Sequence, residues 1–111
     1  MISLDILEKN LRSLNDEQMN QILDLRDSSF FENELLKLDD ALSDVDLEFD
    51  GEERFIKLSN ATSGHEICSY IIEDIEMIEK ALLINYQSPL VVYLMRCYES
   101  GKVPYELPLS I

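Results

Sequence analysis

Residues that break, kink or cross-link a chain are scarce in this sequence. Its 111 residues include three glycines, three prolines, two cysteines, one histidine and no tryptophan. Two cysteines are too few for a disulfide framework, so Cys68 and Cys97 are expected to be the reduced thiols of a cytoplasmic protein. So little glycine and proline argues against long flexible linkers. We therefore expect a single globular domain over residues 1–111.

Long apolar runs are also missing. The longest, residues 90–95, falls far short of the roughly 18 apolar residues that a membrane span requires. Near the N-terminus, Asp5 and Glu8 interrupt the apolar pattern, which is not typical of a signal peptide. The sequence therefore predicts a cytoplasmic protein with no membrane partner.

Positive charge is in short supply. Nine Lys and Arg stand against 23 Asp and Glu, for a formal net charge of −14. Phosphate binding needs a basic face, so nucleic acid is excluded as a direct ligand. Like charges on one compact domain repel and cost stability, which favours a basic protein partner that offsets them. Simple solubility is the alternative explanation of the surplus.

Apolar residues spaced by three and four predict five helices. They are expected over about residues 3–14, 15–26, 29–43, 64–86 and 89–100. Capping pairs mark several starts, because a polar side chain can accept a hydrogen bond from a free backbone N–H of the first turn. The predicted caps are Asn15 with Gln18, Ser29 with Glu32, Ser63 with Glu66, and Ser88 before Pro89, while Gly101 is expected to end the last helix.

The longest predicted helix has two distinct sides. Its core-facing stripe is expected to contain Ile67, Ile71, Ile75, Ile78 and Leu82. The outer side is expected to carry the acidic residues Glu66, Glu73, Asp74, Glu76 and Glu79. This helix is therefore predicted to be the central one.

Between the third and fourth of these helices the spacing changes to two. Val45, Leu47 and Phe49 alternate with acidic residues, which is typical of a strand with one wet face. Asp50 and Gly51 form a turn signal, and residues 54–58 can return as a partner strand. The fold class predicted is α+β, mostly helical, with about five helices and one small antiparallel β-hairpin over residues 45–58.

Acidic residues concentrate beside and within this predicted hairpin. Residues 32–53 hold ten acids and one lysine, which is ten minus one, or nine net negative charges. We expect the binding surface for a basic partner to include Asp44, Asp46, Glu48, Asp50, Glu52 and Glu53. The alternative is the solvated face of an edge strand, where charge prevents aggregation.

The same acids resemble a calcium loop only in part. Asp46, Glu48 and Asp50 precede Gly51 at the right spacing, but Lys57 stands where the loop needs a bidentate glutamate. No metal and no cofactor is therefore expected.

Candidate catalytic groups are few. His65 and Cys68 are three residues apart at a predicted helix start, where a thiolate would be favoured. Cys68 also continues the apolar stripe of that helix, which favours a buried structural thiol. The sequence has no phosphate loop, dinucleotide fingerprint or zinc spacing. We expect no catalytic residue and no enzymatic activity.

In size, acidity, cytosolic character and carboxylate density over residues 32–53, the chain resembles the immunity proteins of bacterial toxin systems. These include the partners of contact-dependent growth inhibition toxins and of colicin-type nucleases. The resemblance implies one-to-one binding to a cognate toxin domain, often a nuclease. It rests on no diagnostic motif, so it assigns no functional residue. The alternative is an acidic nucleic-acid mimic or regulatory adaptor that binds a basic host protein.

Overall fold

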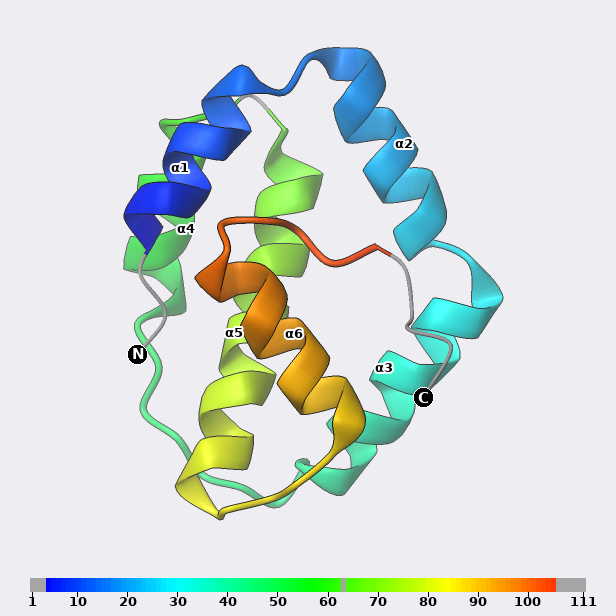
Figure 1. The fold of residues 1–111 in the computed structure, drawn as a ribbon. Helices are drawn as coiled ribbons and strands as arrows, with labels where there is room; N and C mark the ends of the chain where they lie inside the picture. The colour runs from blue at the N-terminus through cyan, green and yellow to red at the C-terminus, as the bar shows by residue number, and fades with distance from the viewer. Residues whose placement is uncertain (1–3, 63, 106–111) are drawn as a thin grey trace.

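A computed structural model of the chain describes residues 4–62 and 64–105, apart from the side chains of residues 29 and 30, and within these ranges every regular element is a helix (Figure 1). The six helices are α1 (Leu4–Ser13), α2 (Asp16–Arg26), α3 (Ser29–Ala41), α4 (Gly51–Ser59), α5 (His65–Leu83) and α6 (Pro89–Glu99). In Figure 1, α5 and α6 lie in the middle, with α1 and α4 on one side and α2 and α3 on the other.

The predicted α+β class is wrong. Residues 45–50 are extended but pair with no strand in the described part of the chain, and residues 51–59 form α4. A short apolar run fits a strand or a helix equally well. The helical conformation is favoured here by the helix macrodipole. The acidic Glu52 and Glu53 lie in the first turn of α4, near its positive end, and the basic Lys57 lies in the last turn, near its negative end. In addition, α4 packs along α5.

The alternation that suggested a strand is nevertheless real. Val45, Leu47 and Phe49 are half-buried, and Val45 and Phe49 pack against the core, while the acids between them are exposed. An extended chain turns successive side chains to opposite sides whether or not it joins a sheet. This segment therefore lies across the helices with its apolar side inward.

The prediction of a central long helix is confirmed. Helix α5 packs against α2, α4 and α6. The side chains of Ile67, Ile71, Ile75 and Ile78 are almost completely buried, as is Cys68. Leu82 is an exception, because more than half of its side chain is exposed.

Two of the predicted helix starts have the expected hydrogen bonds. At the start of α2, Gln18 N donates to Asn15 Oδ1 at 2.8 Å, and Asn15 N donates to Gln18 Oε1 at 3.0 Å. At the start of α6, Leu90 N donates to the Ser88 hydroxyl at 3.2 Å, and Pro89 is the first helical residue. These bonds satisfy backbone groups that a helix leaves unpaired at its N-terminus.

The other two predicted caps differ. Helix α3 is capped one residue earlier, because Phe31 N donates to the Ser28 hydroxyl. The predicted cap Ser63 lies outside the described residues. In the structure Gly64 occupies the N-cap position of α5 and makes no side-chain capping hydrogen bond.

Gly101 ends α6 in the left-handed conformation, with φ of +76°. An added Cβ would lie 2.4 Å from Ile6 Cγ2 and 2.7 Å from Asn10 Nδ2. Gly101→Ala is therefore expected to lower the free energy of unfolding by about 1–2 kcal/mol, because alanine is strained in the left-handed conformation. The steric clash of the added Cβ with Ile6 and Asn10 should lower it further. Urea unfolding followed by circular dichroism measures the loss.

Asn85 serves as the matched control, since it is a non-glycine residue with a φ of 55°. Asn85→Gly is expected to leave stability unchanged or slightly higher, because glycine adopts this conformation without strain. If Gly101→Ala unfolded at the wild-type urea concentration, the steric argument would be wrong.

Candidate functional site

The six acids predicted to bind a partner come together on one stretch of surface. All six are exposed. Asp44 lies in the turn that follows α3. Asp46, Glu48 and Asp50 are the outward-facing members of the extended segment of residues 45–50, and Glu52 and Glu53 lie in the first turn of α4. We call these six residues the acidic segment.

Asp50 differs from the other five because it forms an ion pair. Its Oδ1 lies 2.8 Å from Arg54 Nε, and Arg54 also pairs with Glu79 of α5. The Arg54 guanidinium lies 4.8 Å from the centre of the Phe49 ring. Arg54 therefore joins the acidic segment, α4 and α5, and the carboxylate of Asp50 holds this junction in place.

The remaining five acids form no ion pair within the described part of the chain. Among the ion pairs there, none involves Asp44, Asp46, Glu48, Glu52 or Glu53. Their mutual repulsion is therefore not relieved by these pairs, and a cationic partner would relieve it.

A second acidic feature is a groove between α3 and α5 that sequence reasoning did not single out as a site. Its volume is about 340 Å³. Acidic side chains along it are Asp27, Glu32, Asp39, Glu73 and Glu76, and Leu35, Leu36 and Met77 supply apolar surface. Burial and the neighbouring Asp74 raise the pKa of Glu73. Arg26 and Lys80 also line the groove, and Lys80 pairs with Glu76. The remaining acids beside the apolar surface are suited to a basic side chain with an aliphatic stem.

Asp74 was predicted to lie on the outer side of α5, and this prediction is wrong. Its side chain is buried in the core. Arg26 from the end of α2 donates to both of its carboxylate oxygens, at 2.6 and 2.8 Å, and also to the Pro104 carbonyl at 3.1 Å. The Tyr98 hydroxyl donates to Asp74 as well, at 2.5 Å. The group ties α2, α5, α6 and the chain after α6 together.

Aromatic rings enclose the Arg26 guanidinium, which lies 4.9 Å from the centre of the Phe31 ring and 5.0 Å from that of Tyr70. Burial raises the pKa of Asp74, whereas for Arg26 the contact with Asp74 outweighs burial and raises the pKa. A raised pKa disfavours the charged form of Asp74 but favours the charged form of Arg26. The two short N–H···O contacts favour the ion pair.

One signal in the sequence could have revealed this group. Asp74 lies between Ile71, Ile75 and Ile78 at the three- and four-residue spacing of the buried stripe. A carboxylate in that position has to find a buried partner. The identity of the partner, 48 residues away, is not visible in the pattern.

Tyr70 forms a related bond at the surface, where its hydroxyl donates to Asp27 Oδ1 at 2.5 Å. This bond, with burial and the Asp27 charge, raises the pKa of Tyr70 to about 12. The phenolate thus forms first in the unfolded chain, so the bond's contribution is complete below the ordinary pKa of about 10 and is lost as the pH rises toward 12.

Asp27→Asn is expected to return the pKa of Tyr70 toward 10, because the acceptor charge is removed. Tyrosine ionisation followed at 295 nm as a function of pH measures this change. Asp24→Asn, an exposed acid on the same helix, is the control and should leave the titration unchanged. Burial also raises the pKa of Tyr98, so a second late-ionising tyrosine is expected in both proteins. A titration curve of Asp27→Asn identical to that of the wild type would contradict the assignment.

The candidate catalytic pair does not form a nucleophile and base. Cys68 is completely buried, and burial raises the pKa of its thiol, which confirms the predicted structural thiol. His65 is exposed and stacks on Phe55, with ring centres 6.2 Å apart. Both cysteines are free thiols.

Neither a metal cluster nor a membrane helix is present in the part of the chain that the structure describes. No group of three or more His, Cys, Asp or Glu is arranged to hold a metal ion in residues 4–62 and 64–105. Over the same ranges, no helix combines the length and apolar character that crossing a membrane requires.

The family described as Immunity protein PIM1 matches the chain over residues 2–105. No curated protein and no solved structure gives a match. The match spans all six helices, the acidic segment and the buried Arg26–Asp74 pair. It confirms the resemblance to toxin immunity proteins, and the chain belongs to the PIM1 family of immunity proteins, which implies that it binds a cognate toxin.

Proposed function

We propose that this immunity protein neutralises a nuclease toxin in the cytoplasm by covering the toxin's basic face with its acidic surface. The observation that carries the proposal is the set of five exposed acids that take part in none of the ion pairs of the described residues: Asp44, Asp46, Glu48, Glu52 and Glu53. A nuclease has a basic substrate site because its substrate is a polyanion. An acidic partner is complementary to such a site.

Binding, rather than chemistry on the toxin, is the mode of action that the chain's own groups support. The buried neutral thiol of Cys68 and the separated His65 provide no nucleophile. Asp50 contributes by holding Arg54, and thereby α4, in place beside the five acids that meet the partner. Immunity family membership favours a toxin over the host DNA-handling protein of the alternative hypothesis.

Co-expression tests the proposal. We expect the reading frame directly upstream of this chain to encode the toxin domain. That domain should stop growth when expressed alone and should be tolerated when the chain is co-expressed. In the purified system, one equivalent of the chain should abolish cleavage of DNA or RNA by that domain. A toxin domain that the chain neutralises but that cleaves neither DNA nor RNA would contradict the nuclease assignment.

A further inference from the structure

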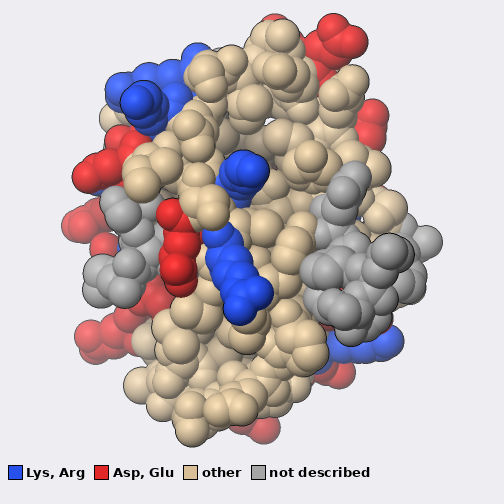
Figure 2. Space-filling view, viewed as in Figure 1, with Lys and Arg blue, Asp and Glu red and all other residues tan. Residues whose placement is uncertain are grey.

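The turn between α5 and α6 exposes a concentration of large apolar side chains. Leu82, Leu83, Ile84, Tyr86 and Val92 are between 38 % and 59 % exposed. Because α5, the turn and α6 form a helical hairpin, we call these five residues the hairpin-end surface. Soluble monomers rarely expose a contiguous group of this kind unless it binds something. In Figure 2 the lower part of the molecule, over the end of α5 and the start of α6, carries few charged side chains. Acidic side chains lie at its edges, and basic side chains lie above it and at its right-hand edge.

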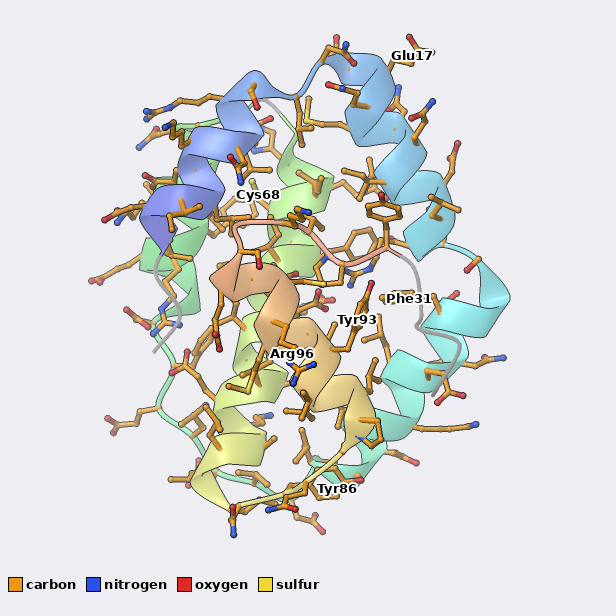
Figure 3. All side chains as sticks on the ribbon, viewed as in Figure 1. Glu17, Phe31, Cys68, Tyr86, Tyr93 and Arg96 are labelled. Atoms are coloured by element: carbon orange, nitrogen blue, oxygen red, sulfur yellow. The ribbon has the colours of Figure 1, made fainter. Side chains whose placement is uncertain are left out.

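The backbone of this turn is held in a defined conformation. Asn85 is left-handed, Asn85 N donates to Leu82 O at 3.3 Å, and Tyr86 N donates to Ala81 O at 2.8 Å. This is the Schellman pattern that closes a helix C-terminus. Figure 3 shows Tyr86 at the lower end of the molecule, in this turn. Exposed side chains on a fixed backbone lose less conformational entropy when a partner covers them.

The hairpin-end surface is continuous with the acidic segment. A groove of about 340 Å³ is lined by Leu47 together with Leu82 and Leu83, and Glu79 and Glu99 lie along it. Leu47 stands in sequence between two exposed acids of the acidic segment, Asp46 and Glu48. A second hollow, of about 740 Å³, is lined by Leu82, Tyr86 and Val92, and Arg96 also borders it. One partner can therefore cover the apolar residues and the acids at the same time.

Charge decides which partner fits. Two copies of this chain would each bring a net charge of −14 to the contact, and their acidic segments would lie beside the shared apolar surface. Like charges close to an interface oppose association. A cationic partner gains from the same acids, so the occupant that suits the surface has an apolar pocket bordered by lysine and arginine.

We infer that the hairpin-end surface is the apolar anchor of the toxin complex, with Leu83, Ile84 and Tyr86 seated in a toxin pocket bordered by basic side chains. This rests on the proposed function. The acids speed the encounter, whereas the apolar side chains slow dissociation, because affinity differences at an interface are mainly differences in dissociation rate.

Leu83→Ala combined with Ile84→Ala tests the inference. Both side chains are largely exposed, so the variant should fold with near-wild-type stability. Surface plasmon resonance with the cognate toxin domain, inactivated by substitution, should show a dissociation rate raised roughly 10- to 100-fold, with the association rate changed less than about twofold. Leu25→Ala with Ile6→Ala is the control, because these side chains are exposed to a similar extent on α2 and α1.

Each other outcome overturns the inference in a distinct way. An unchanged dissociation rate, with wild-type binding intact, overturns the anchor and leaves the proposed function standing. A wild-type chain that does not bind the toxin domain overturns both. A concentration-dependent dimer of the chain alone, abolished by the double variant in sedimentation, assigns the surface to self-association instead.

Discussion

Replacing Asp74 by asparagine is expected to lower the free energy of unfolding by about 3–5 kcal/mol. Asp74 and Arg26 are 1 % and 3 % exposed, so neither charge is hydrated in the folded protein. The neutral amide would leave the Arg26 guanidinium buried without a counter-charge, and its Nε already lacks a hydrogen-bond partner among the described residues. Urea unfolding measures the effect, which is large for a domain of this size because total stability is typically about 5–15 kcal/mol.

Two further variants separate the buried charge from other effects of the change. Arg26→Met combined with Asp74→Asn should recover much of the lost stability, because both charges of the buried pair are then removed. Asp24→Asn, an exposed acid on α2, should change stability by less than about 0.5 kcal/mol. If Asp74→Asn alone unfolded at the wild-type urea concentration, the pair would not be the stabilising contact that its geometry indicates.

Neutralising Asp44, Asp46 and Glu48 together is expected to slow association with the toxin domain by roughly tenfold at low salt. These three side chains are exposed and belong to none of the ion pairs of the described residues, so their charge acts on an approaching partner and contributes little to folding. The variant carries Asp44→Asn, Asp46→Asn and Glu48→Gln. Stopped-flow association rates at low and high ionic strength measure both the loss and the weaker salt dependence that should accompany it.

The control removes the same charges from another place. The control variant carries Asp16→Asn, Glu17→Gln and Asp24→Asn on α2, and it changes the net charge by the same three units, from −14 to −11. In Figure 1, α2 lies at the upper right, whereas the segment that joins α3 to α4 runs along the bottom and the left. This control should slow association much less than the acidic-segment variant. Equal losses in the two variants would show that net charge matters and that its position does not. An association rate independent of salt would remove electrostatic capture altogether.

Features that depend on neighbouring residues could be predicted from the sequence. The Asn15–Gln18 capping box and the left-handed Gly101 follow from side chains and backbone within one helical turn. The exposure of Asp46, Glu48 and Asp50 also followed from local alternation. The burial of four isoleucines in α5 could be predicted because a helix repeats every 3.6 residues; they are Ile67, Ile71, Ile75 and Ile78.

The errors arise where a local pattern permits two structures. Residues 54–58 fit a strand or a helix, and packing of α4 on α5, together with the Arg54 contacts to Asp50 and Glu79, selects the helix. Leu82 continues the buried stripe of α5, yet it is exposed because α5 ends one residue later and the turn carries the chain away to α6.

Local sequence patterns were enough to predict that the chain forms helices, where most of them begin and end, and that negative charge concentrates around residues 32–53. These properties arise from hydrogen bonds, periodicity and composition over a few residues. Packing between distant helices is what pairs Arg26 with Asp74, opens a groove between α3 and α5, and brings an apolar surface beside the acidic segment. Each of these depends on which distant side chains exclude water from one another, and no spacing along the chain encodes that choice.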